Sequence, residues 1–424
     1  MEGADSERKE AGFKQRTPVD EARRILSEAA VGDGNDADDP PTGTETVSLE
    51  RADGRVLAAP ITAARNVPHY QRAAMDGYAV RAGDTFGASD RSPEVLRIGD
   101  RDGPVGPETA VRVHTGSALP DGADAVVMIE HAEELADVGE LEVGDAVAEG
   151  ENIAPIGEDV TEGERLYEAG HRLRPSDLGL LRSVGYGRLE VAQRPTVGVI
   201  PTGEELVDGE PGPGEVIETN GLTVSRMVER WGADATYRDV VTDDAESLRV
   251  AIQRDLTKDV VVTTGGSSVG ERDLLPEVID ELGEVLVHGV GLKPGHPVCL
   301  GIVEDTPVLA LPGYPVACIV NAVQFLRPTL RRLEGTTPDP HPTTRAVLER
   351  KIPSEPGTRT FARVQLEERD GEDGPAFAAT PTRASGSGVL SSVALADGWV
   401  VVDDDLEGIA EGETVAVQDW ESHP

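Results

Sequence analysis

Apolar strands and amphipathic helices alternate along the chain between residues 194 and 335. Runs such as DVVVTTGG and PVLALPG have the length of buried strands, and AESLRVAIQRDL, which precedes the first of them, has helical periodicity. Strands buried on both faces of a parallel sheet are unbroken apolar runs, because helices cover both of those faces. The pattern therefore predicts a doubly wound, mostly parallel α/β domain.

The segments on either side of this region have a different pattern. Short β-like runs between Gly, Pro and Asp turns predict a β-rich domain at 63–149. Further β-like runs follow the proline-rich linker TTPDPHPTT and continue to the C-terminus. Amphipathic helices are expected at about 18–30 and at 176–185, the second with Ser176 as its cap and Gly185 as its stop.

Acidic residues outnumber basic residues by 79 to 39, which gives a net charge of −40. Only five basic residues are lysines: Lys9, Lys14, Lys258, Lys293 and Lys351. This balance, with 3% aromatic residues, predicts adaptation to molar salt, where a short Debye length weakens repulsion between surface charges. Nucleic acid is not an expected partner, because phosphate contacts need clustered Lys or Arg.

Localisation signals and cysteine chemistry are sparse in this sequence. No apolar stretch is long enough to span a membrane, and the charged start MEGADSERKE lacks a signal-peptide core, so a cytoplasmic protein is expected. Cys299 and Cys318 lie in apolar runs, which predicts two buried, unreactive thiols. Two cysteines without a CxxC motif exclude a disulfide framework and a cysteine zinc site.

A glycine-rich turn follows the strand VVVTT. Its glycines let backbone N–H groups converge at a helix start, which suits a phosphate or another oxyanion. The spacing of Gly265 and Gly270 matches a P-loop, but Glu271-Arg272 replaces the required Lys-Ser/Thr, which argues against an NTPase of that type. A purely structural turn is the alternative. The candidate substrate-binding residues are Gly265, Gly266, Ser267, Ser268 and Gly270.

Two proline-rich loops have the same kind of position. Leu311-Pro312-Gly313-Tyr314-Pro315 follows a strand and opens a helix, so Pro312, Gly313 and Pro315 are candidates for ligand contact at the edge where doubly wound sheets bind ligands. Lys293-Pro294 belongs to a KPGHP turn and holds the only lysine between 259 and 350. In a chain that otherwise uses arginine, this lysine suggests a task for a compact ammonium group. A stiff connector and a surface lysine are the alternatives.

Taken in order, the motifs resemble those of the MoeA family, whose pattern the gephyrin E domain also resembles. They are MDGYA, HTG followed by P-x-GADAVV, GEN and GED, TGEEL, TTGG-x-S-x-G-x-x-D, KPG-x-P and LPG-x-P. Each motif alone is typical of a simple turn. The resemblance covers residues 17 to 420.

The resemblance implies a four-domain homodimer whose active cleft combines the α/β domain of one subunit with the β-rich domain of the other. The implied reaction inserts molybdenum from molybdate into adenylated molybdopterin, releases AMP, and needs a divalent cation such as Mg²⁺. Transient contact with other enzymes of molybdenum cofactor biosynthesis is also expected. The implied domains are a discontinuous elongated one at 1–62 and 150–193, a β-rich one at 63–149, the α/β domain at 194–335 and a C-terminal β-barrel-like domain at 336–424.

The resemblance also implies site residues. The catalytic candidates are Asp76, Thr115, Asp159, Glu205, Asp243, Asp273 and Lys293, and three of them, Glu205, Asp243 and Asp273, are the candidate metal ligands. Carboxylate oxygens suit a hard cation, which could polarise a phosphoryl oxygen. Arg363 and Ser387 match family positions for substrate binding. His296 and Gly289 depart from the family, because lysines stand there in other members.

Two other readings of the pattern remain. A molybdopterin adenylyltransferase shares the TTGG-x-S-x-G domain, but it lacks the regions that carry MDGYA and HTG. A non-catalytic, gephyrin-like scaffold is the second alternative, and the acidic composition without a long linker argues against it. A molybdate-binding regulator would carry a basic DNA-reading helix, which the sequence lacks.

Overall fold

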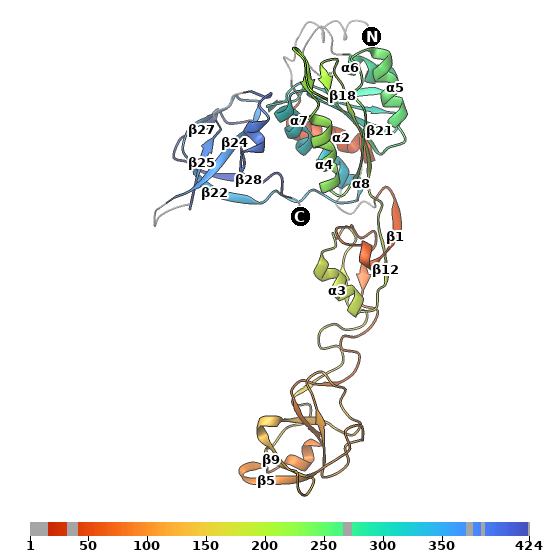
Figure 1. Ribbon diagram of the computed structural model, residues 1–424, viewed down its shortest axis with the longest axis vertical. Coiled ribbons are helices and arrows are strands. Elements are labelled where there is room, and N and C mark those ends of the chain that lie inside the picture. The colour runs from red at the N-terminus through yellow and green to blue at the C-terminus, as the bar shows by residue number, and fades with distance from the viewer. Residues whose placement is uncertain (1–15, 32–40, 266–273, 370–375, 383–385, 423–424) are drawn as a thin grey trace. The chain divides into compact units, whose positions relative to one another are not determined.

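The structure is a computed structural model that describes residues 16–31, 41–265, 274–369, 376–382 and 386–422 (Figure 1). The chain divides into two compact units. The larger unit contains residues 1–45 and 192–424, and the smaller contains 46–191. The finer division into four domains stays a prediction.

A six-stranded sheet forms the centre of the larger unit, in the order β16-β13-β17-β21-β20-β18. The first four strands are parallel, and β20 and β18 are antiparallel additions. The predicted mostly parallel sheet is therefore confirmed. The strands are β13 (Thr196–Pro201), β16 (Asp234–Tyr237), β17 (Val260–Thr264), β18 (Glu284–His288), β20 (Cys299–Val303) and β21 (Thr306–Leu311).

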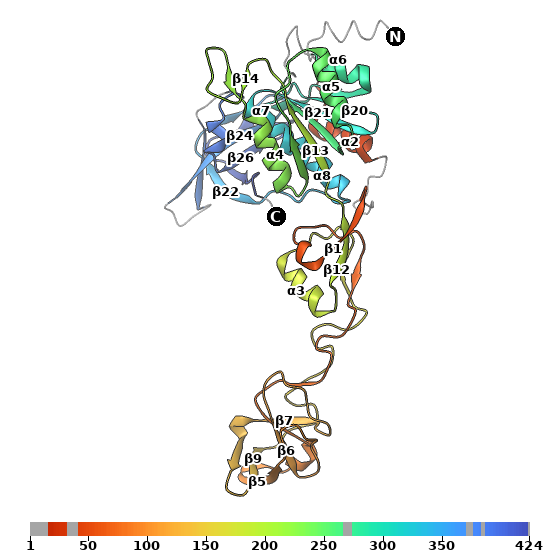
Figure 2. The ribbon, with the colours of Figure 1, turned by 45° about the vertical axis from the view of Figure 1, so that its right-hand side comes forward.

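Helices cover both faces of this sheet (Figure 2). Alternate residues of β17 enter different cores: Val260 and Val262 pack with one group of helices, and Val261 packs with the other. The first group is α2 (Val19–Val31), α4 (Asn220–Arg230), α7 (Pro315–Asn321) and α8 (Arg327–Leu333). The second is α5 (Ala245–Asp255) and α6 (Leu275–Leu282). The sheet is thus doubly wound, as predicted.

The run PVACIVNAVQFLRPTLRRL at 315–333 predicts one helix, but the observed helix is not uniform. A π-helical turn at Ala322–Leu326 separates α7 from α8. Pro328 has no N–H to offer the carbonyl four residues earlier, which is that of Gln324. The Nε of Arg23 donates to this Gln324 carbonyl at 2.9 Å, so a side chain from α2 satisfies it.

The C-terminal part of the larger unit is a closed β-barrel. Five strands pair in the ring β24-β25-β22-β28-β26, and β26 pairs again with β24. The short strand β19 (Leu292–Lys293) joins this ring by parallel pairing with β24. The barrel strands are β22 (Thr343–Leu348), β24 (Arg359–Glu368), β25 (Phe377–Pro381), β26 (Gly398–Val402) and β28 (Thr414–Gln418). The described residues around it add β23 (Ile352–Pro353), β27 (Gly408–Ile409) and α9 (Ser391–Ala394).

The smaller unit contains a six-stranded sheet in the order β7-β4-β6-β5-β9-β8. This finding confirms the predicted β-rich character of this region. Its strands are β4 (Gly77–Val80), β5 (Ser89–Ile98), β6 (Thr109–Val113), β7 (Ala125–Met128), β8 (Ala132–Leu135) and β9 (Glu140–Asp145). Two-stranded ladders join β2 (Ile61–Thr62) with β11 (Arg165–Tyr167) and β3 (Arg72–Ala73) with β10 (Ile153–Ala154), and β1 (Thr44–Ser48) pairs with β12 (Arg188–Ala192).

Three further predictions can be compared with the structure. Both cysteines are free and buried, as expected. None of the described helices combines the length and the apolar character that crossing a bilayer requires. The run TYRDVV at 236–241 also predicts a strand. This strand is displaced in the structure, because β16 ends at Tyr237 and Val241 makes only a single bridge to Thr202.

The start of helix α3 (Pro175–Ser183) also differs from the prediction. Ser176 is not its cap: Arg174 holds that position, and its backbone N–H donates to the carboxylate of Asp177 at 2.9 Å. The prediction failed because Pro175 fills the first helical position, which places the cap at Arg174, two residues before Ser176. Gly185 follows the helix with φ +108°, as expected for a stop.

Asp177 is the centre of a buried polar cluster and is only 2% exposed. Its carboxylate also accepts from the guanidinium of Arg174 at 3.0 Å and from the hydroxyl of Tyr167 at 3.1 Å, and lies 2.8 Å from Nε2 of His171. Burial raises the pKa of Asp177, but the hydrogen bonds from Arg174, His171 and Tyr167 outweigh it and hold the pKa well below its ordinary value.

We predict that Asp177→Asn lowers the free energy of unfolding of the smaller unit by about 1–3 kcal/mol, because charge-assisted hydrogen bonds are lost. A carboxylate with a depressed folded-state pKa stabilises the fold above its unfolded pKa, and this stabilisation is lost as the pH falls. The difference in melting temperature between wild type and variant should therefore be large at pH 7 and shrink toward pH 3. Exposed Asp53→Asn is the control. Equal melting temperatures at pH 7 would contradict the assignment.

Candidate functional site

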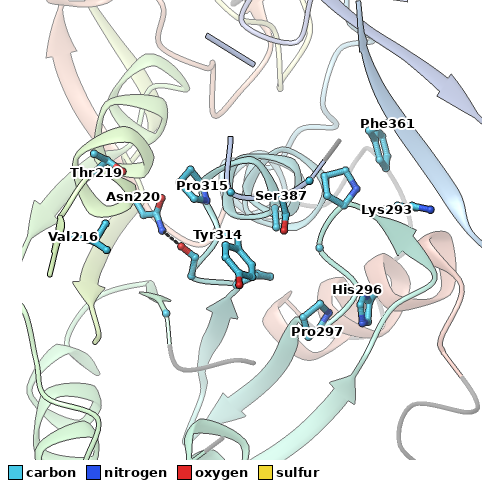
Figure 3. Close-up of a pocket in the computed structure, with 18 of the residues that line it drawn as sticks. Val216, Thr219, Asn220, Lys293, His296, Pro297, Tyr314, Pro315, Phe361 and Ser387 are labelled. Carbon is cyan, nitrogen blue, oxygen red and sulfur yellow. Dashed lines mark hydrogen bonds between the residues drawn. The ribbon is translucent and has the colours of Figure 1, made fainter. Parts of the chain in front are cut away.

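A pocket of about 1580 Å³ lies at the carboxyl edge of the parallel strands in the larger unit. Loops that follow β13, β17 and β21 form one part of its wall, together with the 293–297 turn (Figure 3). Barrel segments around 351–353, 360–363 and 386–388 form another part. The pocket thus lies where doubly wound sheets bind ligands, and the barrel completes it.

Carboxylates gather at the loops after β13 and β16. Glu204, Glu205, Asp243 and Asp244 all line the pocket. The two loops are joined because the N–H of Gly203 donates to the carbonyl of Val241 at 3.1 Å. Asp244 caps α5 by accepting from Ser247 and Thr242, and these bonds lower its pKa to about 2. Asp244 therefore has a structural task, whereas Glu205 projects from an exposed turn.

The start of helix α4 holds one of the pocket loops in place. The amide of Asn220 donates to the carbonyl of Gly313 at 2.7 Å, which ties the helix to the loop after β21 (Figure 3). Glu218 accepts from the backbone N–H of Gly221 at 2.7 Å and from the hydroxyl of Tyr237. Burial and this bond raise the pKa of Tyr237, so the phenol stays protonated and the support stays intact at neutral pH.

The LPGYP loop joins the sheet to the barrel. Pro315 starts α7 as predicted, and the N–H of Val316 donates to the carbonyl of Ser387 at 3.0 Å. Figure 3 shows Ser387 beside Tyr314 and Pro315. The Tyr314 ring is 64% exposed and lines the pocket, which makes it an aromatic surface available to a ligand.

Cationic side chains line another part of the pocket. Lys293 ends β19, where it is paired in register with Thr360, and its Nζ lies 3.9 Å from the carboxylate of Glu355. Arg363 and Lys351 come from the barrel, and Arg363 donates to the carbonyl of Gly386 at 3.5 Å.

A hydrogen bond from a helix holds the KPGHP turn that carries Lys293. The buried amide of Asn321 donates to the carbonyl of Gly295 at 3.0 Å. His296 in the same turn lines the pocket, and burial lowers its pKa, which favours the neutral imidazole at neutral pH. The departure from lysine at position 296 therefore leaves this part of the wall with less positive charge.

The structure places the described candidates of the larger unit in one pocket, although their roles stay predictions. These residues are Glu205, Asp243, Gly265, Lys293, Pro294, Pro312, Gly313, Pro315, Arg363 and Ser387. The candidates Gly266, Ser267, Ser268, Gly270 and Asp273 lie outside the described residues.

The remaining candidates lie in the smaller unit. The carboxylate of Asp76 accepts from the backbone N–H of Thr115 at 2.6 Å and from its hydroxyl at 2.9 Å, and these bonds lower the pKa of Asp76. The two exposed residues therefore form one contact pair. Asp159 is an exposed turn residue whose N–H donates to the carbonyl of Val67, and the described residues include no contact between it and Asp76.

Asn220 and Lys351 are among the pocket residues that the sequence analysis missed. Asn220 lies at the start of a helix, and no local sequence motif marks it as a pocket residue. Its hydrogen-bond partner Gly313 lies 93 residues away in the chain. Lysine is scarce in the chain, and that signal could have identified Lys351 as it identified Lys293. Lys351 lies in the barrel segment, which the sequence did not connect with the pocket.

Of the three candidate metal ligands, Glu205 and Asp243 lie in the described residues and Asp273 does not. In the described segments, no group of three or more His, Cys, Asp or Glu side chains is close enough to hold a metal ion. Glu205 and Asp243 do line the same pocket, and their oxygens are the ligand type that Mg²⁺ prefers. The assignment of these two residues as metal ligands stays a prediction.

Fold and pocket together define a class: a multidomain protein with an α/β ligand-binding domain whose pocket is completed by a β-barrel. Three family models match the chain: the MoeA N-terminal region (domain I and II) at 17–185, a probable molybdopterin binding domain at 198–332, and the MoeA C-terminal region (domain IV) at 345–420.

Named relatives cover nearly the whole chain. A molybdopterin molybdenumtransferase of Bacillus subtilis is 33% identical over 422 residues, which is 96% of this chain and 95% of the relative. A molybdopterin molybdenumtransferase 2 of Mycobacterium tuberculosis is 33% identical over 88% of this chain and 94% of its own. The crystal structure of a MoeA protein from Pyrococcus horikosii has a TM-score of 0.80 at 33% identity and covers 96% of this chain and 100% of that one. The chain belongs to the MoeA family.

We predict that Asn220→Ala loosens the loop after β21. Loss of one hydrogen bond of about 1 kcal/mol should raise hydrogen exchange at the Val316 and Cys318 amides about fivefold. The melting temperature should change little, because the helix keeps its buried face. Arg226→Ala, which removes only a surface pair on the same helix, is the control. Unchanged hydrogen exchange in the Asn220→Ala variant would show that the loop after β21 does not depend on the Asn220 hydrogen bond.

Proposed function

We propose that this protein inserts molybdenum into adenylated molybdopterin, with molybdate as co-substrate and AMP as the released product. The observation that carries the proposal is that one pocket combines loop carboxylates, cationic side chains and glycine- and proline-rich loops. Membership of a family whose named relatives are molybdopterin molybdenumtransferases supports it.

The carboxylates have the role of cation ligands in this proposal. Glu205 and Asp243, with Asp273, hold a divalent cation, here Mg²⁺, which neutralises charge on the phosphoanhydride when it is bound. The chain's own contribution is to fix the two carboxylate loops against each other through the Gly203 to Val241 hydrogen bond. A cleft of carboxylates without a cation would repel both anionic substrates.

The loops and cations have the role of substrate ligands. The Gly265–Gly270 turn binds a phosphate of the pterin substrate, with Pro312, Gly313 and Pro315 forming the adjacent wall. Lys293 attracts the oxyanion, and Arg363 and Ser387 contact molybdate from the barrel. Pro294 fixes the backbone next to Lys293.

The alternatives are not favoured. A molybdopterin adenylyltransferase would correspond to the α/β domain alone, whereas family models match both flanking regions as well. In this chain a barrel also supplies part of the pocket wall. A cytoplasmic location, adaptation to high salt and transient contacts with other enzymes of the pathway remain part of the proposal.

We predict that purified protein releases AMP from adenylated molybdopterin only when molybdate and a divalent cation are present. Chelation should abolish turnover, and added Mg²⁺ should restore it. Glu205→Gln and Asp243→Asn should raise the Mg²⁺ concentration needed for half-maximal rate, because each removes a charged ligand, while the surface variant Glu229→Gln should match wild type. Full turnover after exhaustive chelation would overturn the metal assignment. A parallel series with tungstate measures the preference for the metal.

We further propose a homodimer in which the Asp76 group of one subunit acts with the pocket of the partner. Asp76→Ala and Lys293→Ala proteins should each be nearly inactive. Equal mixing after unfolding and refolding should recover about a quarter of wild-type activity, because half of the closed dimers are mixed and each mixed dimer keeps one intact site. Mixed dimers that form and stay inactive would show that each subunit works alone.

A further inference from the structure

Lysine is rare in this chain, and its location is not random. Of the three lysines that lie in described segments, Lys293 and Lys351 line the pocket, and Lys258 lies before β17 at the opposite end of the strand. Two of these three lysines thus line the same pocket, in a chain whose basic residues are mostly arginine.

The two side chains come from different elements. Lys293 ends β19, and Lys351 precedes β23 in the barrel. The strand position of Lys293 is paired with Thr360, whose hydroxyl lies 2.8 Å from that of Ser354, three residues after Lys351. A short path of backbone pairing and hydrogen bonding thus connects the two lysines.

The backbone of Lys351 is fixed on both sides. Before it, the backbone N–H of Glu349 donates to the carbonyl of Ala379 at 3.0 Å, and the Arg350 guanidinium donates to the carbonyl of Pro381. Ile352 is only 3% exposed and pairs with Ile409. The Lys351 side chain itself is exposed, and within the described segments it has no hydrogen bond or ion pair. A positioned backbone with an unengaged ammonium group is suited to contact a ligand, because little has to be displaced or reorganised.

The balance of charged side chains in the pocket indicates a role for the Lys351 ammonium group. The described lining has five carboxylates, Glu204, Glu205, Glu218, Asp243 and Asp244, against Lys293, Lys351 and Arg363. Lys293 also has the Glu355 carboxylate 3.9 Å away, whereas Lys351 has no such neighbour in the described segments. An incoming polyanion therefore meets an uncompensated positive charge at Lys351.

We propose that Lys351 is a second substrate-binding lysine, which contacts a tetrahedral oxyanion at the barrel side of the pocket. The inference rests on the proposed function and adds a residue to it. The oxyanion is either a phosphate of the adenylated pterin or molybdate. An ammonium group with three donors on a flexible stem suits a tetrahedral anion, whereas a guanidinium favours planar, bidentate partners.

The test compares full-length wild type with Lys351→Ala, Lys351→Arg and the control Lys258→Ala. Half-saturation is measured for adenylated molybdopterin at saturating molybdate, and for molybdate at saturating adenylated molybdopterin. Lys351→Ala should raise one of the two values about tenfold, as expected for a hydrogen bond to a charged group, and the arm that moves identifies the anion. Lys351→Arg should recover part of the loss. The difference should shrink as salt is raised, which a purely structural role would not produce.

The proposal is overturned if both half-saturation values of Lys351→Ala stay within twofold of those of Lys258→Ala. If wild type itself does not turn over adenylated molybdopterin, the proposed function fails, and calorimetry with pyrophosphate and with molybdate still tests Lys351. Weaker binding of either anion to Lys351→Ala than to Lys258→Ala then supports the lysine. Equal binding of both anions to the two variants excludes it.

Discussion

The parallel pairing of Leu292–Lys293 with Arg359–Thr360 is the interaction on which the pocket depends. It joins the strand that carries Lys293 to the barrel strand β24, which also carries Phe361 and Arg363. A bidentate ion pair, in which Arg359 donates twice to Asp20 at 2.8 Å, holds helix α2 at the same junction. Because this junction is made of backbone hydrogen bonds and a two-point ion pair, it fixes orientation as well as distance.

The pocket contains both acidic and basic side chains, and the two kinds come from different structural elements. The carboxylates belong to loops at the ends of parallel strands, whereas Lys351 and Arg363 belong to the barrel. Direct neutralisation within the pocket is limited to partners close in space, such as Lys293 and Glu355. Such separation lets a cation and an oxyanion be bound side by side, which the proposed chemistry requires.

Side chains from neighbouring helices satisfy backbone carbonyl groups around the pocket. Gln324 gives its carbonyl to Arg23 where Pro328 removes the helical donor, and Asn321 holds Gly295 from beneath the turn. Hydrogen bonds from side chains in the flanking helices thus support the pocket loops.

The sequence by itself determined most strands and helices of the α/β domain, because unbroken apolar runs and Gly or Pro turns are local signals. The ordered motifs determined the family and nominated residues that the structure places in one pocket, among them Glu205, Asp243 and Lys293. Errors arose where local signals compete, as at Ser176, where Pro175 moved the helix start. Only the tertiary structure decided that the barrel closes the pocket, that Asn220 holds Gly313 and that Lys351 shares a wall with Lys293. These contacts join residues that are far apart in the chain. The spacing of residues along the sequence does not specify such contacts, because long-range packing sets the distances between them.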